Sequence, residues 1–73
     1  MVIVKKGSDR MKNYIVIVCN WNGFYYLRPD LEFSESLGDD VLWPADEWDM
    51  ESIENYVFDD AQKYSYTYKI EEL

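Results

Sequence analysis

A β-forming run followed by Asn22-Gly23 constrains this chain more than any other feature. Every residue from 14 to 19 is β-branched, aromatic or cysteine, and a run that is apolar on both faces indicates a strand in the middle of a sheet. Asn22-Gly23 favours a two-residue type I′ turn, because both residues tolerate the positive φ that this turn needs. We therefore expect a β-hairpin made of residues 13–20 and 24–28.

A two-residue turn also predicts which side chains share a face of the hairpin. The expected cross-strand pairs are Trp21 with Phe24, Cys19 with Tyr26, and Val18 with Leu27. The odd-numbered side chains of the first strand then lie with Phe24 and Tyr26, and the even-numbered ones lie with Tyr25 and Leu27. Both faces are apolar, so we expect a helix to cover one of them. The other face is either covered by another segment or open for binding.

The later part of the chain predicts one helix and a last strand. Asp49 is a good N-cap for a helix of residues 50–64, and Trp48 is spaced from Ile53 as in a hydrophobic staple. The positions that repeat with helical spacing and should face the core are Ile53, Tyr56, Val57, Ala61 and Tyr64. Residues 66–71 then alternate between apolar and polar, which is typical of a strand with one exposed face.

These elements predict a single α+β domain, because 73 residues leave room for one domain only. We expect an antiparallel sheet with the strand order 24–28, 13–20, 66–71 and the helix packed on one face. Residues 2–6 are a candidate fourth strand at an edge, which makes the sheet three- or four-stranded. Met11 offers a second start, so residues 1–10 are alternatively an extension. Residues 30–48 contain turn signals without periodicity, and we expect an irregular connection there.

The charge is concentrated in one part of the chain. The net charge is −8, and residues 30–60 contain twelve acidic residues without a single Lys or Arg. Nucleic acid is a polyanion and an unfavourable direct ligand for such a surface, whereas a basic protein surface is a favourable one. A solubilising role would also explain an excess of acids, but mixed charges would stabilise the helix better.

Residue types needed for catalysis are missing. The chain has no histidine, its three glycines are isolated, and Cys19 has no histidine to activate it. Acids between positions 39 and 49 lack the alternating spacing of a calcium loop. We expect no enzyme, no cofactor and no metal site. One cysteine allows no intrachain disulfide, and the apolar run of residues 14–19 is too short to span a membrane, so we expect a cytoplasmic protein.

The acids in and around the connection to the helix form the candidate surface for a protein partner. Trp43, next to Pro44, is the candidate exposed anchor, because Trp is enriched at interface hot spots. The alternative for Trp43 is that it folds back over the open sheet face. The candidate partner-binding residues are Asp39, Asp40, Trp43, Asp46, Glu47, Glu51, Glu54 and Asp59.

In size, acidity, lack of catalytic residues and hairpin–helix–strand plan, the chain resembles small acidic inhibitor proteins made by bacteriophages. Anti-CRISPR, anti-restriction and uracil-DNA glycosylase inhibitor proteins belong to this group, and several are DNA mimics whose carboxylates stand where phosphates would be. The resemblance implies an inhibitor in the host cytoplasm, which blocks a basic, nucleic-acid-binding surface of a host protein. The chain is expected to be a monomer or a homodimer. The alternative is a structural or regulatory module that binds or dimerises through a strand edge or an aromatic sheet face carrying Tyr14, Tyr25 and Leu27.

Overall fold

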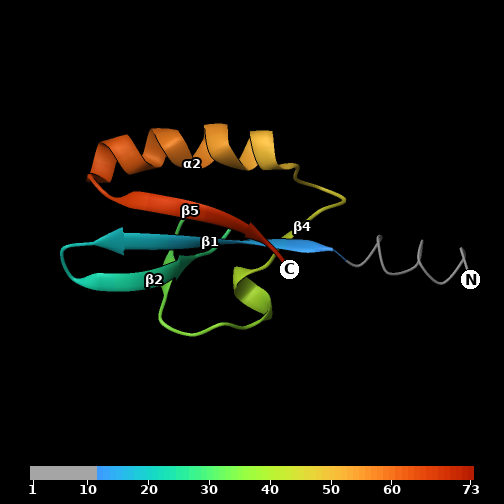
Figure 1. Ribbon diagram of the computed structural model, residues 1–73, viewed down its shortest axis with the longest axis horizontal. Coiled ribbons are helices and arrows are strands. Elements are labelled where there is room, and N and C mark those ends of the chain that lie inside the picture. Colours follow the sequence, from blue (N-terminus) through green and yellow to red (C-terminus); the bar gives the residue numbers. More distant parts are fainter. Residues whose placement is uncertain (1–11) are drawn as a thin grey trace, which may run out of the picture.

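The computed structural model describes residues 12–73 and arranges them as an antiparallel sheet with an α-helix on one face (Figure 1). In chain order the elements are β1 (Asn13–Asn20), β2 (Gly23–Leu27), β3 (Phe33–Ser34), the 3-10 turn η1 (Asp39–Val41), β4 (Trp43–Pro44), α2 (Met50–Tyr64) and β5 (Thr67–Glu72). The α+β class is confirmed. β1 and α2 have the predicted bounds, and β2 and β5 are each shifted by one residue. The candidate strand of residues 2–6 lies outside the described residues.

β1 is the central strand of the sheet. β5 pairs with it along one edge, and the pairing is antiparallel. Along the other edge, β2 pairs with residues 16–20 of β1, and the two-residue β4 pairs with Asn13 and Tyr14. β3 adds to the outer edge of β2. The predicted order of the three main strands, β2, β1 and β5, is therefore confirmed.

The hairpin turn lies one residue earlier than predicted. Asn20 pairs with Gly23, so the turn residues are Trp21 and Asn22. The positive φ, 131°, falls on Gly23 at the start of β2, and neither turn residue has a positive φ, so the turn is not type I′. The side chain of Asn20 stabilises this turn, because its Oδ1 accepts a hydrogen bond from the backbone N–H of Asn22 at 2.8 Å.

The shifted turn changes the cross-strand pairs but not the faces. Cys19 pairs with Phe24 and Val18 with Tyr25, so the predicted pairs of Cys19 with Tyr26 and of Val18 with Leu27 are wrong, as is the pair of Trp21 with Phe24. Each partner has moved by two positions. Because side chains alternate with a period of two, the predicted division of the hairpin into two faces still holds.

α2 begins at the predicted N-cap and ends at a residue in the left-handed conformation. The carboxylate of Asp49 accepts a hydrogen bond from the backbone N–H of Ser52 at 2.7 Å, and this hydrogen bond lowers the pKa of Asp49. After the last turn, Ser65 adopts the left-handed conformation, with a φ of 60°, and its N–H donates to the carbonyl of Ala61.

One side of α2 packs on the sheet. Ile53, Val57 and Ala61 are buried there, as predicted. Tyr56 and Tyr64 are exposed, so their prediction as core residues is wrong. No helix within residues 12–73 combines the length and the apolar character needed to cross a bilayer.

The sheet face under α2 carries the core. Val16, Val18 and Leu27 are fully buried there, and the partly buried Tyr14 packs against this core. Tyr25 lies on the same face, since it pairs with Val18. The expectation that Tyr14, Tyr25 and Leu27 form an open binding face is therefore wrong, because this is the face that α2 covers.

The other sheet face is covered at one end only. η1 lies on the side of the sheet away from α2 (Figure 1), and its Val41 is fully buried, as Ile15 nearly is. Near the hairpin turn the face is open: Phe24 is 75% exposed, and Trp21 in the turn is 93% exposed. The expectation of an irregular connection over residues 30–48 is also wrong, because β3, η1 and β4 lie within it.

Candidate functional site

Trp43, the predicted exposed anchor, is fully buried. β4 places it opposite Tyr14, and its ring packs edge-on against Trp48 with 4.8 Å between the ring centroids. Its Nε1–H donates to the carbonyl of Leu27 at 2.8 Å, so the buried indole has a hydrogen-bond partner. Trp43 does fold back onto the sheet, but as a core residue beneath α2. The prediction that it contacts a partner is wrong.

The seven acidic candidates are all exposed, but they do not form one surface. Asp39 and Asp40 begin η1, on the side of the sheet opposite α2 (Figure 1). Asp46 and Glu47 lie in the turn before α2. The remaining three, Glu51, Glu54 and Asp59, are on α2 itself. The structure therefore divides the predicted acidic track into separate groups.

One basic residue from outside residues 30–60 lies against the acidic stretch in the structure. Arg28 lies just before it, and its guanidinium contacts a carboxylate oxygen of Asp30 at 3.1 Å and one of Asp40 at 3.9 Å. All three side chains are at least partly exposed, so these ion pairs contribute little to stability. They do reduce the negative charge beside η1, which leaves α2 as the more acidic part.

The acids of α2 point to different sides of the helix. Residues five positions apart lie about 140° apart around an α-helix, which separates Glu54 from Asp59. Glu54 lines a groove between α2 and β5. Asp59 lines a depression on the side facing the loop of residues 30–33, and it is the only one of the eight predicted residues to do so.

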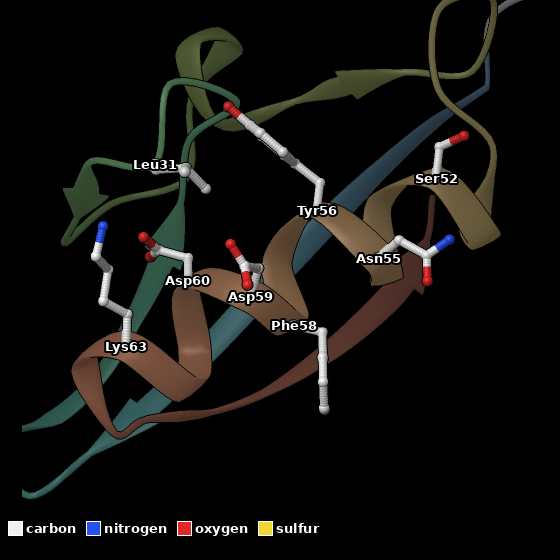
Figure 2. Close-up of a pocket in the computed structure, with 8 residues that line it drawn as sticks. All are labelled: Leu31, Ser52, Asn55, Tyr56, Phe58, Asp59, Asp60 and Lys63. Carbon is white, nitrogen blue, oxygen red and sulfur yellow. The ribbon is translucent and has the colours of Figure 1, made fainter.

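Two adjoining depressions lie between α2 and the loop of residues 30–33, and together they form what we call the α2 groove. The first, of about 750 Å³, is lined by Leu31, Ser52, Asn55, Tyr56, Phe58, Asp59, Asp60 and Lys63. The second, of about 620 Å³, is lined by Asp30, Leu31, Glu32, Phe33, Asp60 and Tyr64. Figure 2 shows Leu31 facing the side chains of Tyr56, Asp59 and Asp60. Leu31 and Asp60 line both depressions, so the two are continuous.

The α2 groove is acidic. Four carboxylates line it, from Asp30, Glu32, Asp59 and Asp60, against one basic residue, Lys63. None of the ion pairs formed within residues 12–73 involves a carboxylate of α2. Carboxylates gathered on one surface repel one another, and their combined field attracts a cationic ligand.

Asp60, which lies in both depressions, is held in place from beneath. The hydroxyl of Tyr66 donates to Asp60 Oδ2 at 2.6 Å. Tyr66 is buried, and this burial, followed by the hydrogen bond to Asp60, raises the pKa of the Tyr66 hydroxyl. A hydroxyl that keeps its proton remains a donor, so this hydrogen bond orients the carboxylate of Asp60 in the groove.

The opposite wall of the groove is a tight turn with an unusual backbone. The N–H of Leu31 donates to the carbonyl of Arg28 at 2.8 Å, and the N–H of Arg28 donates to the carbonyl of Glu32 at 2.9 Å. Leu31 has a φ of 69°, a left-handed conformation that is uncommon for a residue with a bulky side chain. Its side chain packs against the core cluster, which holds the turn against α2. Strain of this kind concentrates at functional sites.

The α2 groove offers a ligand mainly hydrogen-bond acceptors and apolar surface. Within residues 12–73, no three His, Cys, Asp or Glu side chains gather closely enough to hold a metal ion. Cys19 lies on the sheet face away from α2, so no thiol reaches the groove. What the groove presents is negative charge over a partly apolar floor.

Sequence reasoning missed most of the groove. Asp30 and Glu32 stand at the start of the acidic stretch and Asp60 at its end, and nothing in their spacing shows that the two ends meet. The nearest signal is Arg28-Pro29-Asp30, a turn pattern that makes the chain reverse before β3. Comparison with protein-family models, curated proteins and solved structures found no match to this chain.

Proposed function

We propose that the protein is a binding protein without catalytic activity, and that its α2 groove receives a basic segment of another protein. The observation that carries this proposal is the meeting of four carboxylates, with one basic residue among them, in a groove whose floor is partly apolar. A cytoplasmic partner with an Arg- and Lys-rich surface fits this chemistry.

Arg and Lys side chains match both features of the groove. Each has an apolar stem and a charged head. Leu31 offers apolar surface to the stems, and Asp59, Asp60 and Glu32 offer carboxylates to the heads. The exposed ring of Tyr64 adds a face that can bind a cation, and Lys63 Nζ already lies 5.9 Å from the centroid of this ring. A bare metal ion would use only the carboxylates.

We propose further that binding inhibits the partner by covering cationic side chains that otherwise bind nucleic acid. Such surfaces hold phosphates through Arg and Lys, and carboxylates compete for the same groups. The acidic phage inhibitors that the chain resembles include DNA mimics, whose carboxylates stand where phosphates would be. Its support is the acidic groove and the net charge of −8.

A short Arg- and Lys-rich peptide is the probe that tests this proposal. Added to isotopically labelled protein, the peptide should shift the backbone amide resonances of residues 30–33 and of the groove side of α2. Its affinity should fall steeply as salt is raised. Added to a complex of the same peptide with duplex DNA, the protein should release the DNA. Shifts spread evenly over all exposed acids, or DNA that stays bound, would contradict the proposal.

The open sheet face near the hairpin turn supports a second candidate function, a module that binds through aromatic side chains. Its observation is the exposure of Trp21 and Phe24, 93% and 75%, beside the partly exposed Cys19 and Tyr26. A partner held there should tolerate salt, because apolar association is not screened. Trp21→Ala should abolish that binding without affecting the binding of the basic peptide. Equal loss of both would contradict two separate sites.

A further inference from the structure

We propose that two copies of this chain pair through the outer edge of β5, antiparallel and centred on Ile70, to join their sheets into one. Within residues 12–73, β5 hydrogen-bonds to β1 on one side, and no other strand pairs with its second edge. Unpaired edges are the natural site of strand-to-strand association. This inference does not depend on the proposed function, because β5 lies outside the α2 groove.

The hydrogen-bond pattern of β5 shows which backbone groups point outward. The N–H of Leu73 donates to the carbonyl of Asn13, so Leu73 faces β1. In an antiparallel ladder this orientation alternates along the strand. Tyr68, Ile70 and Glu72 therefore direct their N–H and carbonyl groups away from β1. A second β5 can satisfy them when outward residues lie opposite outward residues.

Charge selects one register among those that the backbone allows. Centring on Ile70 places Lys69 opposite Glu71 of the second copy, and Glu71 opposite its Lys69. The backbone also allows the two neighbouring registers, which are centred on residue 69 or on residue 71. In the first, Lys69 lies opposite Lys69 of the second copy, and in the other, Glu71 lies opposite its Glu71. Opposite charges stabilise cross-strand pairs, and like charges destabilise them. In the Ile70-centred register, residues 68–72 of the two copies lie opposite one another.

The surroundings of β5 are suited to self-association. Glu71 pairs with Lys69 at 3.1 Å and Glu72 with Lys12 at 2.8 Å, so the charges of β5 itself are balanced, while Glu54 of α2 lines the groove beside it. Phe58, which is 51% exposed, lines the groove between α2 and β5, and Figure 2 shows it pointing away from Leu31. Directly opposite residues share a face, so pairing places both helices on one side of the joined sheet and brings the two Phe58 side chains toward each other.

A charge-swap series tests both the edge and the register. In sedimentation equilibrium, the wild-type chain should show a reversible dimer. Lys69→Glu alone and Glu71→Lys alone each place like charges opposite one another and should weaken dimerisation about tenfold or more. The double variant Lys69→Glu/Glu71→Lys restores opposite charges and should dimerise like the wild type. An equal mixture of the two single variants should form heterodimers for the same reason.

Because the side chain of Lys69 is exposed and that of Glu71 is partly exposed, these variants should fold, and circular dichroism checks that they do. Hydrogen exchange adds a second readout: the amides of Tyr68, Ile70 and Glu72 should gain protection as protein concentration rises. A chain that stays monomeric at about 1 mM, or a dimer that both single variants leave intact, would overturn the proposal. Protection of these amides in a monomer would show that another segment of the same chain occupies the edge, and would overturn it as well.

Discussion

At the scale of single residues, Tyr66 and Asp60 connect the core to the candidate site. The ring of Tyr66 packs in the core cluster, and its hydroxyl reaches the groove through Asp60. This hydrogen bond is partly buried, and a hydrogen bond to a charged group contributes at most about 1.5–3 kcal/mol to stability. One pair of side chains therefore helps both to stabilise the fold and to orient a carboxylate for binding.

The raised pKa of Tyr66 predicts a loss of stability in alkali. Burial and the hydrogen bond to Asp60 raise this pKa above its ordinary value of 10.0, so the hydroxyl ionises in the unfolded chain first. The contribution is fully present below pH 10 and is lost as the pH rises above it. Thermal unfolding followed across this range should show the decline, and Tyr66→Phe, less stable at neutral pH, should flatten it. Tyr64→Phe, which removes an exposed hydroxyl, is the control; the same slope in all three proteins would refute this linkage.

Gly23 is the residue of the hairpin whose backbone conformation favours glycine. Its φ of 131° is one that L side chains rarely adopt, so Gly23→Val should cost about 1–3 kcal/mol of stability. Gly38→Ala is the matched control: Gly38 is extended, and its nearest neighbour is the movable side chain of Asp40 at 3.2 Å. That change should stay within about 0.5 kcal/mol. An unaltered melting temperature for Gly23→Val would show that the turn has another geometry.

At the scale of elements, α2 was predictable and the connection before it was not. The start and the apolar spacing of α2 follow from neighbouring residues, such as Asp49 and Ser52. β3 and β4 are two residues long each and exist because distant strands pair with them. The burial of Trp43 depends on the same pairing. The left-handed φ of Leu31 has no local signature either, so the groove wall could not be read from the sequence.

Ser65 ends α2 in a conformation that suits glycine better. It has a φ of 60° and a ψ of 52°, where a Cβ atom is unfavourable. Ser65→Gly should therefore raise stability by about 0.5–1 kcal/mol. Gln62→Gly, at an exposed position within the helix, should instead lower it by about 1 kcal/mol. Urea denaturation measures both; a loss of stability in both would show that Ser65 makes contacts that outweigh its backbone strain.

Glu54 and Asp59 should respond differently to the same substitution. Glu54 lies three residues after Glu51, so Glu54→Lys replaces a like-charge pair with an attractive one and should stabilise the helix by about 0.5 kcal/mol. Asp59 lies four residues before Lys63, so Asp59→Lys creates a like-charge pair and should lower stability by a similar amount. Chemical denaturation at low salt distinguishes them. Equal effects would mean that net charge, not local pairing, controls the stability of α2.

At the scale of the whole molecule, the fold redistributes a charge that is continuous in sequence. The acidity of residues 30–60 and its preference for a basic partner could be predicted from composition. The grouping of the acids could not, because it depends on the rotation of α2 and on a sheet that separates α2 from Asp39 and Asp40 (Figure 1). The two ends of the acidic stretch meet in the α2 groove, while its middle lies elsewhere.

The most direct test of the central claim compares two variants that change the net charge equally. Glu32→Lys with Asp59→Lys reverses two carboxylates in the α2 groove, whereas Glu35→Lys with Asp39→Lys reverses two exposed carboxylates outside it. The affinity of the Arg- and Lys-rich peptide is measured for both, after circular dichroism confirms that each is folded. We predict at least a tenfold loss, about 1.4 kcal/mol, for the groove variant and a much smaller loss for the other. Equal losses would contradict the assignment of the groove and show that the acidic residues act only through the net charge.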